Sequence, residues 1–200
     1  MPQQIELPGF EPAPDSEVVE HSLFFAMLPD AATAARIRVL AERLRAQHGL
    51  QDKLLYPEHL HVTLQALQST KPTPPRPQLI EVARQVAATI VSPPFDIVFD
   101  HALRFGRPAD RNRALVLQSG DGSGVVQLTA FQQRLGTALA QRGLRLPRPP
   151  DPHMTLLYTS RHVAKQPIEP LRWTTTTFTL VHSYVGETRH EHLGIWPLNG

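Results

Sequence analysis

Residues 61–64 read His-Val-Thr-Leu, and residues 153–156, which lie 153 − 61 = 92 positions further on, read His-Met-Thr-Leu. The pattern His-x-Thr-Leu is rare by chance. With 10 His, 15 Thr and 26 Leu in 200 residues, roughly 0.1 copies are expected in a chain of this composition. Each copy follows a proline-containing loop and opens an apolar segment with the alternation typical of a β-strand. A spacing of about half the chain predicts two similar lobes that each contribute one strand.

Short apolar segments alternate with helical patterns around these two copies. Strands are predicted at residues 20–28, 60–67, 95–100, 113–118, 154–158, 178–185 and 193–198, and helices at 30–48, 78–91 and from the glycine-rich turn 120–124 to about 142. Proline-rich loops at 70–77 and 145–152 lie close to the two copies. The pattern predicts a single α+β or α/β domain over residues 20–200, preceded by a flexible, proline-containing tail at residues 1–19.

Composition excludes several classes of protein. Hydrophobic residues make up 41% of the chain, which is enough to form a core and excludes disorder of the whole chain. The absence of cysteine excludes disulfides, zinc–thiolate sites and cysteine nucleophiles. No apolar run approaches the roughly 18 residues of a membrane span. The N-terminus also lacks the basic-then-apolar pattern of a signal peptide, so we expect a cytoplasmic protein without a membrane partner.

Charge is unevenly distributed along the chain. Residues 1–35 contain six acids and neither Lys nor Arg, so residues 36–200 hold all 20 basic residues against 18 − 6 = 12 acids, a net charge of +8. Seventeen of the basic residues are Arg, whose planar fork suits phosphate. The distribution favours a partner that carries phosphate, although a solvated arginine-rich surface would look the same.

Strand periodicity places residues i and i+2 on one face, so each motif histidine points to the same side as its threonine. Two facing imidazoles can share acid–base work, because a neutral ring takes a proton from water while a charged ring gives one to a leaving oxygen. The hydroxyls of Thr63 and Thr155 can donate to the phosphate oxygens between them. This chemistry needs no metal and no cofactor, and it suits hydrolysis of a cyclic phosphodiester.

The chain resembles the 2H phosphoesterase superfamily, which is named for two His-x-Thr/Ser-x motifs. Within it, the chain is most similar to the bacterial RNA 2′,3′-cyclic phosphodiesterases, also called the 2′-5′ RNA ligase family. The resemblance rests on residues 23–29 (LFFAMLP), 60–64 (LHVTL) and 152–156 (PHMTL), and on the order of elements from about residue 20 to the end of the chain.

The resemblance implies a bilobal α+β fold of two pseudo-symmetric lobes, with mainly antiparallel sheet, helices on the outer faces and a central cleft. It implies hydrolysis of 2′,3′-cyclic phosphates to 2′-phosphates, in RNA processing, with His61 as proton donor and His153 as proton acceptor. The expected partners are RNA ends or small cyclic nucleotides, with no obligate protein partner. Reversible 2′-5′ RNA ligation is a further family activity, since hydrolysis and ligation share a leaving group.

One departure from the family pattern affects the substrate. The family often has Arg three residues after the second threonine, where this chain has Tyr158. Either Arg161 replaces that contact with phosphate, or Tyr158 stacks on a base. Two alternatives therefore stay open, namely the same dyad acting on another small cyclic nucleotide or a 2′-5′-linked oligonucleotide, and a non-catalytic protein that binds RNA ends.

The remaining histidines and the arginine cluster have weaker interpretations. His-x-His pairs at 59/61 and 190/192 could bind zinc, but neither has a defined third ligand, so we expect no metal site. His182 is predicted to pack within its strand. The arginines at 104, 107, 111 and 113 form either a solvated loop or an RNA-backbone contact.

Overall fold

The computed structural model of the protein describes residues 19–106 and 113–200, so residues 1–18 of the expected tail and Arg107 and Arg111 of the arginine cluster lie outside the described residues. In chain order the elements are β1 (Glu20–Met27), α1 (Ala31–Gln47), the 3₁₀ turn η1 (Pro57–His59), β2 (Val62–Lys71), α2 (Pro77–Ala87), β3 (Phe95–Phe105), β4 (Arg113–Gln118), the 3₁₀ turn η2 (Ser123–Val125), α3 (Val126–Gln141), β5 (His153–Thr159), β6 (Gln166–Thr175), β7 (Thr177–Val185) and β8 (Arg189–Pro197).

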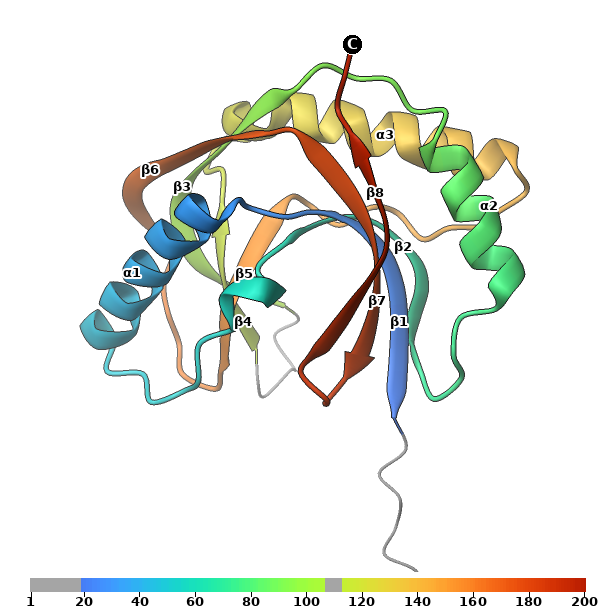
Figure 1. The fold of residues 1–200 in the computed structure, drawn as a ribbon. Helices are drawn as coiled ribbons and strands as arrows, with labels where there is room; N and C mark the ends of the chain where they lie inside the picture. The colour runs from blue at the N-terminus through green and yellow to red at the C-terminus, as the bar shows by residue number, and fades with distance from the viewer. Residues whose placement is uncertain (1–18, 107–112) are drawn as a thin grey trace, which may run out of the picture.

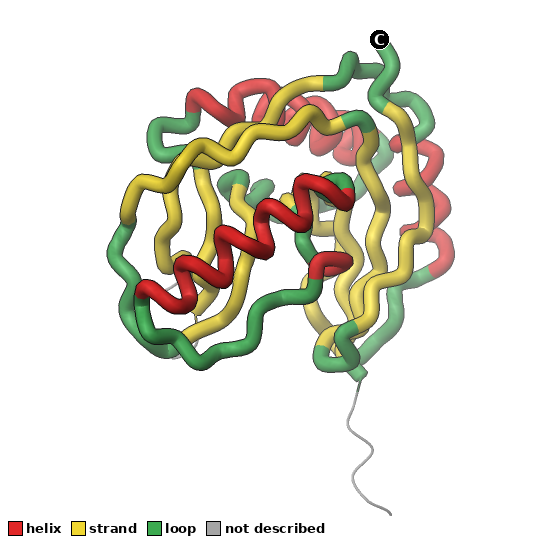
Figure 2. Tube along the Cα trace, turned by 60° about the vertical axis from the view of Figure 1, so that its left-hand side comes forward, coloured by secondary structure: helices red, strands yellow, loops and turns green. Residues whose placement is uncertain are grey.

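All eight strands form one sheet in the order β6-β3-β4-β5-β2-β1-β7-β8. Every pairing in it is antiparallel, which confirms the predicted α+β class. The sheet is strongly curved, with α1 beside one half and α2 beside the other (Figures 1 and 2). Strand β5 contains the second motif, and β2 begins within the first motif, directly after His61. The two strands are neighbours at the centre of the sheet, with three further strands on each side.

The predicted helix at 30–48 is confirmed as α1, and its start follows from one capping residue. The Asp30 carboxylate accepts hydrogen bonds from the backbone N–H of Thr33 (2.7 Å) and from its hydroxyl (3.0 Å). These bonds lower the pKa of Asp30 below its usual value. Ala34, Ile37 and Leu44 are buried at helical spacing, so one stripe of α1 packs into the main core.

Alternation along the two motif strands separates the core from the functional face. Val62 and Leu64 on β2 and Met154 and Leu156 on β5 are buried in the main core. The histidine and threonine of each motif therefore lie on the opposite face, which we call the motif face. The buried residues Phe24, Ala26 and Val181 form a separate small cluster on this face.

Strand β6 is not among the strands predicted from the sequence. It contains Pro167 and Pro170, which argue against a strand because proline cannot donate to a ladder. The sheet order explains the exception, since β6 is an edge strand and only one of its sides pairs, with β3. Strand β8 also begins earlier than predicted, at Arg189, and β3 extends beyond residue 100 to Phe105.

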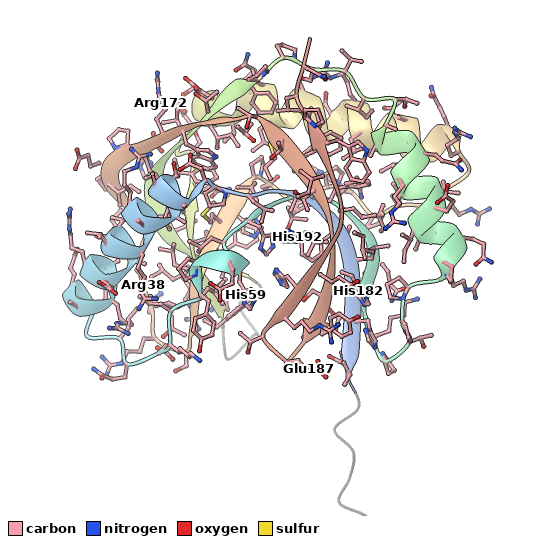
Figure 3. All side chains as sticks on the ribbon, viewed as in Figure 1. Arg38, His59, Arg172, His182, Glu187 and His192 are labelled. Atoms are coloured by element: carbon pink, nitrogen blue, oxygen red, sulfur yellow. The ribbon has the colours of Figure 1, made fainter. Side chains whose placement is uncertain are left out.

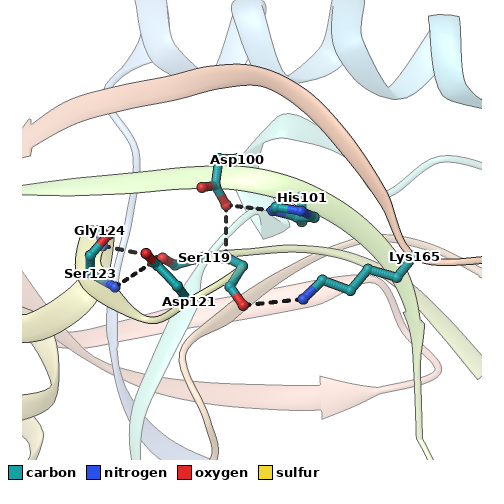
Figure 4. Close-up of polar contacts among 8 residues, drawn as sticks. Asp100, His101, Ser119, Asp121, Ser123, Gly124 and Lys165 are labelled. Carbon is teal, nitrogen blue, oxygen red and sulfur yellow. Dashed lines mark hydrogen bonds and ion pairs between the residues drawn. The ribbon is translucent and has the colours of Figure 1, made fainter.

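The glycine-rich turn predicted at 120–124 connects β4 to α3 and is tied to β3 (Figure 4). The Asp100 carboxylate accepts hydrogen bonds from the backbone N–H of Gly120 (2.7 Å) and from Nδ1 of His101 (2.8 Å), and Lys165 donates to the Gly120 carbonyl (3.1 Å). The His101 bond, followed by the Gly120 bond, lowers the pKa of Asp100. A side chain at Gly124 would collide with the backbone of β3, so this close approach requires glycine.

Candidate active site

The two motifs meet at the junction of β2 and β5. Val62 pairs with Met154 in an antiparallel register. Continuing this register places His61 opposite Thr155 and Thr63 opposite His153, all four on the motif face and partly exposed. Residues that are diagonal across such a pair lie about 7–8 Å apart, with their Cβ atoms somewhat closer, a spacing at which both rings could contact one phosphate group. A local two-fold axis through the Val62–Met154 pair therefore relates the two motifs.

Both motif histidines are held in the same tautomer by backbone carbonyls. Nδ1 of His61 lies 2.7 Å from the carbonyl oxygen of His59, and Nδ1 of His153 lies 2.7 Å from that of Asp151. A carbonyl only accepts, so each Nδ1 carries the proton and donates it. The Nε2 atom of each ring is therefore the one that exchanges protons, as a base when the ring is neutral and as an acid when it is charged.

Each motif histidine also stacks on a phenylalanine. The ring of His61 lies 5.0 Å from that of Phe24 on β1, at an interplanar angle of 28°. The ring of His153 lies 4.5 Å from that of Phe105 at the end of β3, at 25°. Stacking fixes the plane of each imidazole, and the carbonyl bond fixes its rotation. Both contacts join segments that are distant in the sequence, so they depend on sheet register and have no local signal in the chain.

The surroundings of the two histidines differ in charge. Burial lowers the pKa of both below the usual value. Next to His61, the His153 and His59 rings lower its pKa further, whereas the Asp151 carboxylate acts to raise that of His153. In the free protein, both rings are therefore shifted toward the neutral form, and among the described residues only His153 has a carboxylate nearby that opposes this shift.

A further histidine from β8 approaches the first motif. The His190 ring lies 4.4 Å from that of His59 and 5.7 Å from that of His61, and it meets Phe24 edge-on at 6.0 Å. Burial, with the nearby His61 and His59, lowers the pKa of His190 to about 4, so this ring is neutral at pH 7. Its Nδ1 is buried with no hydrogen-bond partner among the described residues. The only signal for it in the sequence was the His-x-His pair at 190/192.

The other residues predicted to bind substrate lie further along β5. Tyr158 is half exposed and pairs with Ala114 on β4. The Arg161 backbone N–H donates to the Thr159 hydroxyl (3.1 Å), and the Arg161 guanidinium lies near Gly49, past the end of α1. No contact joins either side chain to a motif histidine among the contacts between described residues, so their roles stay predictions.

His182 packs within its strand, as predicted, but it has a partner. It is buried on β7, and its Nε2 lies 3.0 Å from Nδ1 of His21 on β1. Register places His182 beside Leu23, on the opposite side of the sheet from Phe24, so this pair is not part of the motif face. Figure 3 labels His182 near β1, and His59 at the end of η1.

A cavity of about 730 Å³ lies away from the motifs, between the far end of β2, the start of α2 and the loop after α3. Neither motif histidine lines it. We place the site at the histidines rather than in this cavity, because the groups able to exchange protons are gathered there.

In residues 19–106 and 113–200, no group of three or more His, Cys, Asp or Glu side chains is arranged to hold a metal ion. No helix in these ranges is long and apolar enough to cross a membrane.

Comparison with known proteins gives a consistent result. The sequence model of the 2′-5′ RNA ligase superfamily matches residues 29–187. Among solved structures, Escherichia coli LigT in complex with NADP+ is similar with a TM-score of 0.68 and 24% identity, covering 90% of this chain and 99% of that chain. A protein described as a phosphoesterase has a TM-score of 0.68 at 25% identity, with the same coverage. The protein TT0787 of Thermus thermophilus has a TM-score of 0.68 at 18% identity, covering 90% of this chain and 98% of its own. No curated protein matches by sequence.

Proposed function

Since this chain belongs to the 2′-5′ RNA ligase superfamily, we propose that it hydrolyses 2′,3′-cyclic phosphodiesters, at RNA ends or on nucleotides, to 2′-phosphates. One observation carries the proposal. Two imidazoles share the motif face, each has its Nδ1 bonded to a carbonyl, and each has its Nε2 left to exchange protons. Extending the register of the Val62–Met154 pair puts each ring opposite the threonine of the other motif, whose hydroxyl would then face the same space.

The proposed reaction balances with one water. Nε2 of neutral His153 takes a proton from water as the water oxygen attacks phosphorus. The bond between phosphorus and the 3′-oxygen breaks, and Nε2 of protonated His61 gives its proton to that oxygen. The products are a 2′-phosphate and a free 3′-hydroxyl. Thr63 and Thr155 donate to the non-bridging oxygens, where negative charge accumulates in the transition state.

The surroundings of His61 favour its protonation when the substrate is bound rather than in the free protein. The donor role of His61 comes from the family resemblance, yet the free protein disfavours a proton on His61. A bound phosphodiester carries a negative charge beside this ring, and an opposite charge favours the protonated form. Substrate binding would therefore charge the acid, so that the reactive protonation state is assembled with the substrate in place.

The charge of the chain is consistent with this substrate. Residues 36–200 carry a net charge of +8, mostly from arginine, which suits phosphate-bearing molecules. The related LigT of Escherichia coli has structures in complex with phosphate and with 3′-AMP. A ligand of the same class is proposed for this chain.

A second candidate substrate rests on one residue. The exposed ring of Tyr158 stands where the family often has a phosphate-binding arginine, so the chain offers a stacking surface in place of a charge. This favours recognition of a base, as in a small cyclic nucleotide or a 2′-5′-linked oligonucleotide. Reversible 2′-5′ ligation would use the same two histidines in opposite order.

The test compares a short RNA that ends in a 2′,3′-cyclic phosphate with a 2′,3′-cyclic mononucleotide and a 2′-5′-linked dinucleotide. We expect turnover that EDTA does not reduce, and a 2′-phosphate product identified by phosphorus NMR. A higher kcat/KM for the RNA indicates recognition of a chain, whereas equal values indicate a nucleotide substrate. Binding of the RNA with no product from any substrate would overturn the proposal in favour of an RNA-end-binding protein.

A further inference from the structure

The loop that leads from α3 into the second motif carries prolines at 147, 149, 150 and 152. Proline has no backbone N–H, so this segment offers carbonyl acceptors but few donors of its own. Two buried glutamine side chains supply the missing donors. Nε2 of Gln65 donates to the Pro147 carbonyl (3.0 Å), and Nε2 of Gln132 donates to the Pro150 carbonyl (3.2 Å).

The amide of Gln132 makes a second bond that reaches the first motif. Its Nε2 also donates to the backbone carbonyl of Thr63 (3.1 Å). One NH₂ group therefore links the first motif strand to the residue that lies three positions before His153. Gln132 makes this link from α3, a helix that contains neither motif.

Gln132 occupies a position on its helix where an apolar side chain is expected. The buried apolar residues of α3 include Leu128, Phe131 and Leu135, and Gln132 lies on the same stripe, four residues after the first and three before the last. Its side chain is only 3% exposed. An apolar residue would normally occupy such a site, since burying an amide is unfavourable unless it is hydrogen-bonded.

Apart from the Gln65–Pro147 bond, which also joins β2 to this loop, the junction between the motifs has few direct contacts among the described residues. Strands β2 and β5 share one ladder pair, Val62 with Met154. The Asp151 carbonyl that fixes the His153 ring lies in the same loop, one residue after Pro150. Where this loop lies thus sets where Nε2 of His153 lies relative to the first motif.

We propose that Gln132 is a positioning residue that fixes the second motif against the first. This proposal rests on the proposed function in one respect, because the effect of Gln132 on kcat is measured with the hydrolysis of a cyclic phosphate. Gln132 acts through the Thr63 and Pro150 backbone. Loss of its two hydrogen bonds lets the loop before His153 shift, and displacement of a catalytic group by about 1 Å can reduce turnover on the order of 100-fold.

Gln65 provides a matched control. It is 1% exposed, and its Nε2 also donates to two carbonyls, those of Ala66 and Pro147. Its loop bond is further from His153 along the chain, and neither acceptor is the carbonyl of a motif residue. Methionine has the length of glutamine without a donor, so Gln132→Met and Gln65→Met remove comparable bonds from comparable burial.

The experiment measures kcat, KM and Tm for the full chain and both variants. We expect Gln132→Met to lower kcat about 10- to 100-fold with KM within about threefold, and Gln65→Met to keep kcat within about threefold at a similar loss of Tm. Equal losses of kcat in both variants, or wild-type kcat in Gln132→Met, would overturn the proposal. If Gln132→Met does not fold, Gln132→Leu replaces it, because an apolar side chain also cannot donate to the two carbonyls.

A second measurement does not depend on the reaction. The His153 ring is titrated by NMR in the free chain, where its pKa is lowered by burial. We expect this pKa to move toward its ordinary value in Gln132→Met and to stay unchanged in Gln65→Met, because only the first loosens the loop around the ring. If the wild type hydrolyses no cyclic phosphate, the proposed function fails while this titration still decides the role of Gln132.

Discussion

Replacing a motif histidine by asparagine isolates the proton transfer from the positioning of the side chain. The Nδ2 atom of asparagine occupies nearly the position of the histidine Nδ1. His61→Asn therefore keeps a donor to the His59 carbonyl, which His61 contacts at 2.7 Å, but it lacks Nε2. His61→Gln does the reverse, placing a polar group near Nε2 while losing the Nδ1 bond.

The expected magnitude follows from what each variant loses. Proton transfer by one positioned group contributes about 10²–10⁴-fold to the rate, which is about 2.7–5.5 kcal/mol of barrier. His61→Asn loses this whole contribution, and the same holds for His153→Asn. The two variants together should cost little more than either alone, because residues that act as a unit are not additive. The stack on Phe24 is also lost, and this affects stability by about 0.5–1.5 kcal/mol.

The assay is single-turnover hydrolysis of a 2′,3′-cyclic mononucleotide at saturating enzyme. His192→Asn is the control, because it makes the same substitution at an exposed histidine on β8 that belongs to neither motif. The rate of this variant should stay within about twofold of wild type. We expect His61→Gln to be as slow as His61→Asn. A His61→Asn rate within tenfold of wild type would refute the assignment of Nε2 as a proton-transfer group.

Further predictions concern pH, packing and stability. Because burial lowers the pKa of both His61 and His153, kcat/KM should rise as pH falls from 8, with a maximum below about 6.5; a maximum above 7.5 would contradict this. Phe105→Leu removes the stack on the second ring and should lower kcat about two- to tenfold in the same assay. Asp30→Ala should cost about 1 kcal/mol in urea unfolding at pH 7. The folded-state pKa of this carboxylate is lowered, so the cost should be present above about pH 4 and disappear as pH falls through the folded pKa. Gly124→Ala should lower Tm by several degrees, because its methyl group would collide with a β3 carbonyl oxygen.

The sequence was informative where a pattern repeats or alternates. The two His-x-Thr-Leu copies predicted one strand each, and the structure shows that these strands are neighbours, paired through Val62 and Met154. Capping and periodicity likewise predicted α1 from Asp30 onward. These features depend on residues close together in the chain, which one sequence can display.

Contacts between distant segments were not predictable in the same way. The stacks of Phe24 and Phe105, and the approach of His190, depend on strand register and on the curvature of the sheet. Strand β6 was missed because its prolines are tolerated only at an edge, and edge position is a property of the whole sheet. Gln132 did leave a local signal, as a lone amide on the apolar stripe of α3.

The local two-fold axis through the motif pair has a consequence for the orientation of the substrate. A phosphate group turned by half a revolution about this axis would meet the same rings and the same hydroxyls, with acid and base exchanged. The four motif side chains by themselves therefore do not distinguish the 2′-oxygen of a ribose from its 3′-oxygen. That choice, and with it which phosphate isomer is released, falls to groups that break the symmetry. His190 and His59 stand on one side and Asp151 on the other, so for the proposed reaction the regiochemistry would be set by the surroundings of the two motif histidines and not by the histidines themselves.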